Sequence, residues 1–325
     1  MRTILRFIFA GLIIFFTITG LNRLKQTPAK QKNEESTMTT NKEHKELEKT
    51  AAKGNAQAQF ELGLYEYNQK NYGLALSWFQ KAADQNHLDA MSNLSLMYNQ
   101  GIGTDTNLTT SINWAQKAAN LNHSQAQLQL GVAYLTGRGL EQNPQQAFEL
   151  FNKSAAQNNK DAQNNLAVMY LNGIGTQQDT SKAFEYYLKA AQQGHVDAQN
   201  NVAILYSEGI GVEKNTQESV NWFTISAQNG NFQAQNNLGM IYSTGAGVEK
   251  NYQIAINCFL ASAKQGYPQA QYNLGLMIEN GHGVESNPQQ ALFWYQQAAK
   301  NNFEPAKQAF AQLQQKTTTT TTETN

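Results

Sequence analysis

The sequence predicts an all-α solenoid of about seven helical hairpins that ends in a C-terminal capping helix. Three observations indicate this fold: glycine pairs recur at a constant interval of 36 residues, apolar residues between them follow helical spacing, and the same helix-capping residue types return at fixed positions. A fixed period of this size is typical of a repeat array. The glycine pairs are Gly101/Gly103, Gly137/Gly139, Gly173/Gly175, Gly209/Gly211, Gly245/Gly247 and Gly281/Gly283.

Each repeat is predicted to contain two amphipathic helices. In one copy, Ala162, Leu166, Met169 and Tyr170 lie at i, i+4, i+7 and i+8, which places them on one stripe of a helix that we name helix A. A second stripe follows the glycine loop and defines helix B, with Ala183, Tyr186, Tyr187, Ala190 and Ala191. A single hairpin cannot bury both stripes, so we expect neighbouring hairpins to stack and to stabilise one another.

The ends of helix B carry the residue types that helix termini favour. Side chains that can accept a hydrogen bond from the first helical turn precede it, and Pro144 and Pro288 follow two of them at the first helical position. Only Gly or Asn occurs just after helix B, because these residues tolerate the left-handed conformation that ends a helix. The residues before helix B are Asn107, Asn143, Asp179, Asn215, Asn251 and Asn287, and those after it are Asn86, Asn122, Asn158, Gly194, Gly230, Gly266 and Asn302.

The repeated motif A-Q-x-N-L-G-x-x-Y-x-x-G-x-G, followed by A-x-x-W-F and A-A-x-x-G, resembles the Sel-one-like repeat family, a 36-residue relative of the tetratricopeptide repeat. The resemblance covers about four-fifths of the chain in seven copies. It implies a right-handed α/α superhelix in which helices A line a concave groove used for partner binding. It does not imply a reaction.

The N-terminal residues 1–21 have the pattern of an export signal. Arg2 and Arg6 precede an uncharged apolar run from Phe7 to Leu21. The run suits a cleaved signal peptide, and an uncleaved signal anchor is the alternative if Arg6 reaches the membrane surface. We therefore expect an exported protein that is periplasmic, anchored in the inner membrane and facing the periplasm, or secreted, with membrane contact only through residues 1–21.

The remaining segments outside the repeats are predicted as follows. Residues 22–46 are polar, lack apolar periodicity and are expected to form a disordered spacer. The solenoid is expected over 47–316, with a shortened first copy that lacks the glycine pair and a last helix from about Glu304 to Lys316 that covers the final hairpin. The threonine-rich tail, 317–325, is expected to be disordered.

Composition argues against several classes of function. Lys and Arg number 24, as do Asp and Glu, so the chain lacks the basic surface that nucleic-acid binding needs. The single cysteine, Cys258, excludes a disulfide framework and occupies a helix B position held by Trp in four other copies, which predicts a core role. Some exported relatives carry a cysteine pair in each repeat and have been linked to penicillin binding, and this chain departs from that pattern.

The sequence offers no arrangement that indicates catalysis, a cofactor or a metal ion. The Gly-x-Gly loops follow a helix and lack the third glycine of a dinucleotide-binding motif. His87, His123 and His195 recur about one repeat apart, too far for a shared metal ion. No serine is followed three places later by lysine, the arrangement of penicillin-recognising enzymes. We therefore predict that the protein is not an enzyme.

One set of polar residues is a candidate binding site, which we name the amide ladder. Amide side chains occupy the position directly before the core residue of helix A, with Glu61 there in the first copy. An amide can donate and accept a hydrogen bond at once, as binding of an extended peptide backbone requires. The alternative is that these side chains only bond a neighbouring helix A. The ladder comprises Asn93, Gln129, Asn165, Asn201, Asn237 and Asn273.

These observations predict a non-enzymatic scaffold of the cell envelope that binds an extended peptide or a protein in its concave groove. The alternatives are a hydrolase directed at peptidoglycan or β-lactams, a regulator of cell-wall enzymes, and a secreted factor that contacts a host or wall surface through its convex face. The sequence does not identify the partner.

Overall fold

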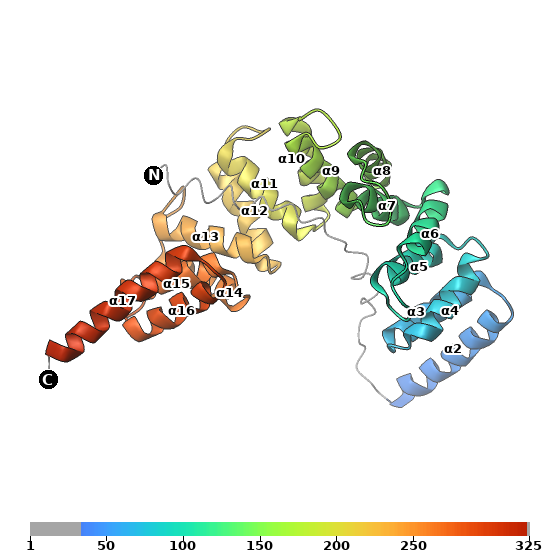
Figure 1. Ribbon diagram of the computed structural model, residues 1–325, viewed down its shortest axis with the longest axis horizontal. Helices are drawn as coiled ribbons and strands as arrows, with labels where there is room; N and C mark the ends of the chain where they lie inside the picture. Colours follow the sequence, from blue (N-terminus) through green and yellow to red (C-terminus); the bar gives the residue numbers. More distant parts are fainter. Residues whose placement is uncertain (1–33, 324–325) are drawn as a thin grey trace. The chain divides into compact units, whose positions relative to one another are not determined.

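The computed structural model describes residues 34–323 as sixteen α-helices without a strand (Figure 1). The described chain forms two compact units, residues 34–186 and residues 187–323, with the boundary inside one helix. Consecutive helices pack on one another from α2 to α9 in the first unit and from α11 to α17 in the second. The prediction of an all-α array of stacked hairpins is confirmed.

The helices alternate between the two predicted types along the chain. Helices A are α3 (Ala56–Asn68), α5 (Leu88–Gln100), α7 (Ser124–Thr136), α9 (Lys160–Asn172), α11 (Val196–Glu208), α13 (Phe232–Thr244) and α15 (Pro268–Glu279). Helices B are α4 (Tyr72–Ala83), α6 (Leu108–Asn120), α8 (Pro144–Ala156), α10 (Thr180–Gln192), α12 (Thr216–Gln228), α14 (Tyr252–Lys264) and α16 (Pro288–Lys300). Two further helices flank them, α2 (Glu34–Ala52) and α17 (Glu304–Glu323).

The predicted residues at the two ends of helix B have the predicted roles. Each of the six Asn or Asp side chains before helix B accepts a hydrogen bond from the backbone amide three residues later, at 2.9–3.1 Å. The seven Asn or Gly residues after helix B all have positive φ, between 57° and 90°. These local rules therefore fix the length of each hairpin.

The two glycines of each loop have different tasks, which the loop after α9 illustrates. Gly173 ends α9 in the left-handed conformation, and its amide bonds the carbonyl of Met169. Gly175 lies against the first turn of α8 in the preceding repeat, where a Cβ atom would stand 2.6 Å from the carbonyl carbon of Pro144. The second glycine thus joins one hairpin to the hairpin before it. The same pairing occurs at Gly103 with Tyr72, Gly139 with Leu108, Gly247 with Thr216 and Gly283 with Tyr252.

A buried aromatic ring marks the centre of almost every hairpin. Six of the seven helices B carry Phe or Tyr at one repeat position, and none of these rings is more than 3% exposed. Glycine on the facing helix A admits the ring in several copies, as at Gly131 opposite Phe151. The exception is Ala115 on α6, which faces α5 in the second repeat. The six aromatic residues are Phe79, Phe151, Tyr187, Phe223, Phe259 and Tyr295.

In six of the seven repeats, the glutamine of the A-Q motif links helix A to the end of the helix before it, and α5 carries Met91 at this position. The side chain of Gln59, for example, donates to the carbonyl of Ala51 at 3.1 Å, and Gln271 donates to Ala263 at 3.2 Å. A carbonyl in the last turn of a helix has no partner within the helix, so this bond satisfies a group that would otherwise be buried unpaired. The glutamine is therefore a stacking residue.

The N-terminal part of the solenoid differs from the predicted boundary. Residues 22–46 were expected to be a disordered spacer, whereas α2 begins at Glu34 and packs on α3 (Figure 1). No Gly or Pro interrupts 34–52, and Glu, Lys and Ala favour a helix. Leu47 and Ala51 contact the core of the first hairpin, which agrees with packing that starts near Leu47. Residues 1–33, which include the predicted export segment 1–21, lie outside the described residues.

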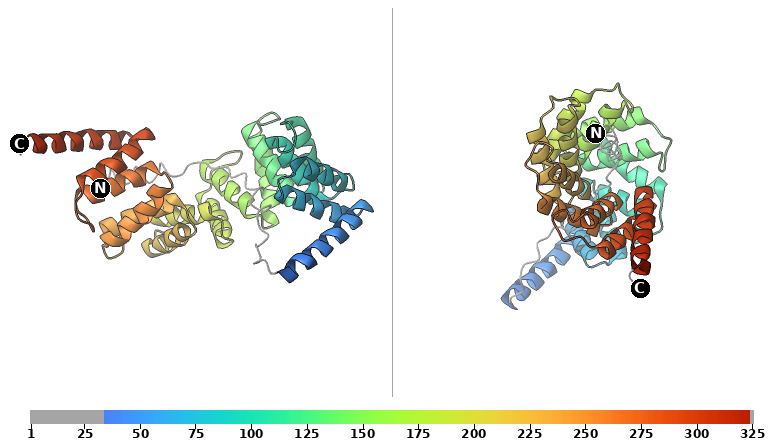
Figure 2. Two further views of the ribbon diagram at one scale, coloured as in Figure 1. Left: turned by 90° about the horizontal axis from the view of Figure 1, so that it is seen from below. Right: turned by 90° about the vertical axis from the view of Figure 1, so that its left-hand side faces the viewer.

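The C-terminal helix is longer than predicted. It covers the last hairpin, where Leu313 joins a cluster with Tyr295 and Leu274, as expected of a capping helix. The tail, 317–325, was predicted to be disordered, but α17 continues to Glu323 and projects beyond the hairpin (Figure 2). The hydroxyls of Thr317 and Thr318 bond carbonyls three and four residues earlier, as threonine side chains within a helix can do.

Candidate functional site

The six residues of the amide ladder fall at one register position on successive helices A. Asn93, Gln129 and Asn165 belong to the unit 34–186, and the other three belong to the unit 187–323. Each precedes a buried core residue, such as Leu94 or Leu166. The helices therefore present the ladder side chains beside the core of each unit and not within it, apart from Asn165, which is fully buried.

Three ladder residues are already engaged inside the protein. Gln129 Nε2 on α7 donates to Ser92 Oγ at 2.8 Å and to the Ser92 carbonyl at 3.3 Å on α5. Asn273 Nδ2 on α15 donates to Asn236 Oδ1 on α13 at 2.9 Å. Asn201 is the hydrogen-bond partner of the buried Tyr187 hydroxyl. For these three residues the structure supports a role in packing.

The other three ladder residues, Asn93, Asn165 and Asn237, make no side-chain hydrogen bond with any other described residue. The bonds of Gln129 and Asn273 reach the residue that stands 37 places earlier on the preceding helix A. For Asn165 that residue is Leu128, and in the shortened first copy the corresponding neighbour of Asn93 is Phe60. Neither apolar side chain can accept a hydrogen bond. For Asn237 that residue is Asn200, which could accept a bond, so an apolar neighbour does not explain every unbonded amide. Bonded and unbonded amides alternate along the chain.

Hollows lie beside three of the ladder residues. Asn93 lines a hollow of about 270 Å³. The same hollow is bordered by Phe60, Asp89, Ser92 and His123. Gln129 lines a cavity of about 200 Å³ among α5, α6 and α7. Asn273 lines a hollow of about 490 Å³ at the corresponding repeat position among α13, α14 and α15. The helix A side of both units thus offers space next to amide groups.

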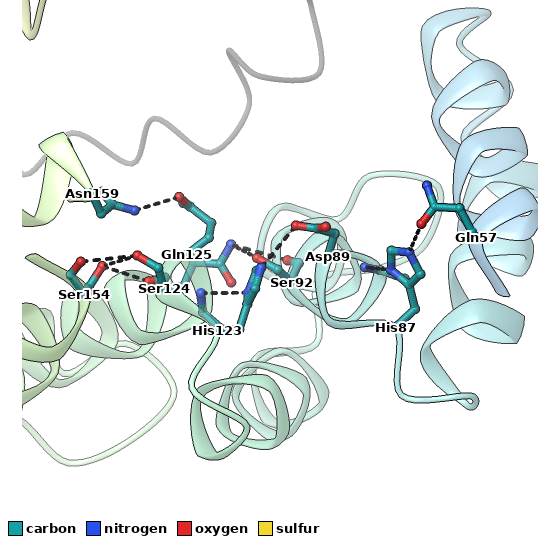
Figure 3. A network of polar contacts seen from close by, with 12 residues as sticks. Gln57, His87, Asp89, Ser92, His123, Ser124, Gln125, Ser154 and Asn159 are labelled. Atoms are coloured by element: carbon teal, nitrogen blue, oxygen red, sulfur yellow. Dashed lines mark hydrogen bonds and ion pairs between the residues drawn. The ribbon is translucent and has the colours of Figure 1, made fainter. Parts of the chain in front are cut away.

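A second polar row, which the sequence did not predict, runs along the N-termini of helices A (Figure 3). The side chain at the N-cap accepts a bond from its own first turn and also contacts the second residue of the preceding helix A. His87 contacts Gln57 at 2.9 Å, His123 contacts Asp89 at 3.1 Å and Asn159 contacts Gln125 at 3.4 Å (Figure 3). The recurrence of His or Asn at one position was the available signal. These histidines are helix caps that bridge repeats.

The cap at His87 predicts a pH-dependent stability. Its Nδ1 accepts a bond from the Ala90 amide, which requires the neutral ring, and burial lowers its pKa below the usual value. The unfolded chain then binds more protons than the folded chain, so the stability from this cap is present above about pH 6.5 and is lost as the pH falls toward the pKa of the folded state.

The variant His87→Asn keeps a side chain that can accept the capping bond but does not ionise in this pH range. Chemical denaturation between about pH 5 and pH 8 should show a smaller pH dependence for the variant than for the wild type. An unchanged dependence would contradict this role.

Burial also shifts the pKa of three other ionisable groups. Burial raises the pKa of Tyr187 and of Tyr295 far above the usual value, and the Tyr295 hydroxyl donates to Glu279 Oε2 at 2.6 Å. Burial also raises the pKa of the Cys258 thiol to about 11, so it carries almost no thiolate at neutral pH.

Over residues 34–323, no group of His, Cys, Asp and Glu side chains is placed to hold a metal ion. The helices of the same range include none with the length and apolar character that crossing a membrane requires.

Comparison with known proteins gives relatives of the same architecture. A crystal structure of c5321, a protective antigen present in uropathogenic Escherichia coli strains displaying an SLR fold, is 34% identical, with a TM-score of 0.75 over 83% of this chain. The chain spans 58% of the length of c5321. A Sel1 repeat protein from Oxalobacter formigenes is 28% identical, with a TM-score of 0.68, over 74% of this chain and 96% of its own. No curated protein matches the chain.

The Sel1 repeat pattern matches seven consecutive segments, 56–87, 88–123, 124–159, 160–195, 196–231, 232–267 and 268–303. These segments agree with the hairpins of the structure, each with one helix A and one helix B. Sel1 repeat proteins are generally protein-interaction scaffolds. With the repeats covering most of the sequence, and with a relative of 34% identity, the chain belongs to the Sel1 repeat family.

Proposed function

We propose that the protein is a non-enzymatic scaffold whose helices A bind an extended, largely uncharged peptide segment of a partner protein. The observation that carries the proposal is the alternation in the amide ladder. Asn93, Asn165 and Asn237 keep their side-chain donors and acceptors unbonded within the described chain. A peptide backbone offers both a donor and an acceptor at every residue, so it matches an unbonded amide on both counts.

Asn165 differs from the other two unbonded amides because it is fully buried. Its Nδ2 and Oδ1 atoms are both buried without a hydrogen-bond partner. A buried polar group in this condition costs about 1–3 kcal/mol of stability, and an apolar side chain there would avoid the cost. A ligand backbone that bonds this amide would remove the cost, and to reach it the ligand must first displace the side chains that cover Asn165.

The ladder also provides a matched test. Peptides are first selected from a display library on the immobilised full-length chain. The variant N93A/N165A/N237A should bind the selected peptides more weakly by roughly 1.5–4.5 kcal/mol, at a net 0.5–1.5 kcal/mol for each hydrogen bond. Calorimetry measures the loss. The affinity should change little with salt, because neither the ladder nor the peptide needs charge.

The control is the triple variant of the bonded residues, Q129A/N201A/N273A. It should lose stability toward denaturant, because it removes bonds within the protein, and should keep most of its affinity for the selected peptides. Equal loss of affinity in the two variants, with dichroism showing both folded, would contradict peptide binding by the unbonded amides. A loss of affinity at moderate salt would indicate a charged surface as the binding site.

We also propose that the scaffold works in the cell envelope, delivered by the export segment 1–21. Support comes from the sequence, in which Arg2 and Arg6 precede the apolar run. Cell fractionation should recover the full-length chain in the periplasmic or membrane fraction, and an Arg2→Glu/Arg6→Glu variant should accumulate in the cytoplasm, because export signals need a positive N-terminal region. Cytoplasmic recovery of the wild type would contradict an envelope role. Secretion to the medium would favour a host-interaction factor.

A further inference from the structure

The hollow of about 490 Å³ beside Asn273, which we name the aromatic hollow, is bordered by four rings of the second unit. Tyr252 begins α14, Tyr272 lies on α15 and Phe303 directly precedes α17. His282, between the glycines of the last loop, stacks on Tyr252 with ring centroids 4.7 Å apart. The centroids of Tyr272 and Phe303 are 5.6 Å apart. The volume lies within the range of about 300–1,000 Å³ that is usual for ligand sites.

The corresponding hollow of the first unit has a different lining and a volume of about 200 Å³. Two leucines stand there at the positions of the two tyrosines, and Arg138 stands at the position of the histidine. The two leucines are Leu108 and Leu128. The aromatic hollow therefore has two more rings and two more hydroxyl groups, and it lacks a permanent positive charge.

Three polar atoms at the aromatic hollow are without a hydrogen bond. The hydroxyls of Tyr252 and Tyr272 and the Oε1 atom of Gln269 bond no described residue, and none of the three atoms is buried. In an earlier repeat the N-cap side chain of Asn159 bonds the glutamine that corresponds to Gln269, whereas Phe303 at this position has no donor. The aromatic hollow thus offers two hydroxyl donors and one acceptor to a ligand.

The charges around the aromatic hollow favour an uncharged ligand. Among the described residues that line it, none is Asp, Glu, Lys or Arg. Lys250 Nζ lies 5.5 Å from the centre of the Tyr252 ring but does not line the hollow. A charged group of a ligand would lose hydration there without meeting an opposite charge.

A proline-rich peptide segment matches these properties. Its rings are apolar groups that pack on aromatic side chains, and its polyproline II helix is formed before binding, which lowers the entropy cost. A proline residue has a carbonyl group but no amide hydrogen, so such a segment offers more acceptors than donors. The two hydroxyl donors of the hollow fit that excess of acceptors.

We propose that the aromatic hollow binds a proline-rich segment of the partner protein in the polyproline II conformation. Proline rings contact Tyr252, Tyr272 and Phe303, and the two tyrosine hydroxyls donate to carbonyls of the segment. This site rests on the proposed function in taking a peptide as the ligand, and it needs no bond to the three unbonded amides of the ladder.

The test is a titration of the methyl-labelled full-length chain with acetyl-hexaproline amide, followed by nuclear magnetic resonance. The methyl resonances of Met240 and Leu276, which line the aromatic hollow, should shift saturably. Those of Leu128 and Val132 in the first unit should not shift. Acetyl-hexasarcosine amide keeps the carbonyls and the tertiary amides but lacks the rings. It should bind about 15-fold more weakly, the factor that corresponds to two fewer buried methylene groups.

Two variants complete the test. Tyr252→Leu/Tyr272→Leu should abolish the shifts while dichroism shows an intact fold. The fold tolerates leucine here, because Leu108 in the first unit makes the contact with Gly139 that Tyr252 makes with Gly283. Tyr252→Phe/Tyr272→Phe keeps the rings and should bind hexaproline more weakly by roughly 5- to 150-fold, the factor of two net hydrogen bonds.

The proposal is overturned if hexaproline leaves Met240 and Leu276 unshifted, if it shifts Leu128 and Val132 equally, if the leucine variant binds as the wild type does, or if hexasarcosine binds as tightly as hexaproline. Shifts of Met240 and Leu276 with chitotriose and not with hexaproline would overturn it in favour of a carbohydrate site. The variant N93A/N165A/N237A separates the two proposals. It should bind hexaproline as the wild type does, whatever its affinity for the peptides selected by display.

Discussion

Phe151→Ala should lower the free energy of unfolding by about 3–5 kcal/mol, the usual cost of deleting a fully buried phenyl ring. Phe151 is 0% exposed, and its ring lies against Gly131 on the facing helix. Relaxation cannot fill the gap easily, because the facing glycine has no side chain to move into it. Urea denaturation of the full-length chain measures the change.

Phe148→Ala provides the control for the loss of a ring on the same helix. Phe148 is only partly buried and meets Tyr170 edge to face, with ring centroids 5.2 Å apart. Its removal should cost clearly less than the removal of Phe151. Equal costs would mean that the buried ring is not a central element of the hairpin.

Gly175→Ala should lower the free energy of unfolding by about 2–4 kcal/mol, because positive φ and a backbone clash combine at this residue. Gly175 has φ of 65°, and its added Cβ would stand 2.6 Å from the Pro144 carbonyl carbon and 3.1 Å from the Gln145 amide nitrogen. Neither atom can move without shifting the first turn of α8. The result is expected in chemical denaturation.

Gly173→Ala separates these two contributions. Gly173 has φ of 67°, but a Cβ there would come no closer than 3.4 Å to Gln178, an ordinary contact. This variant should therefore lose only the part due to backbone conformation, about 1 kcal/mol. If the two variants lose the same stability, the contact between Gly175 and the preceding repeat contributes nothing.

The parts of the fold that depend on neighbouring residues in the chain were predictable from the sequence. Asn143 before α8 and Asn158 after it have the predicted capping and left-handed roles, because a helix end is decided by a few consecutive residues. The stacking of hairpins followed from the two apolar stripes. The extra turns of α2 and α17 did not, because polar composition favoured disorder while the absence of Gly and Pro allowed a helix to continue.

The bonding of the candidate site was not predictable in the same way. All six ladder residues occupy one repeat position, yet they differ in their hydrogen bonds. Gln129 donates to Ser92 on the preceding helix A, whereas the residue at the same position before Asn165 is Leu128, which cannot accept a bond. Asn201 instead bonds Tyr187 on the preceding helix B, and Asn237 stays unbonded although Asn200 stands 37 places earlier. The partner of each amide thus depends on packing that the period alone does not reveal. The missing ring at Ala115 could have been found by aligning the repeats and asking which copy breaks the pattern.

The seating of each second loop glycine on the preceding helix B bears on how such a chain can grow or be recombined. Gly139 rests on Leu108, Gly175 on Pro144 and Gly247 on Thr216, so each loop meets a differently shaped partner. If a hairpin were moved elsewhere in the array, its second loop glycine would rest on the first turn of a different helix B, with a different side chain at the contact. The transferable module therefore runs from one loop to the next, and a crossover placed in the loops, at the ends of the module, keeps the two matched surfaces together.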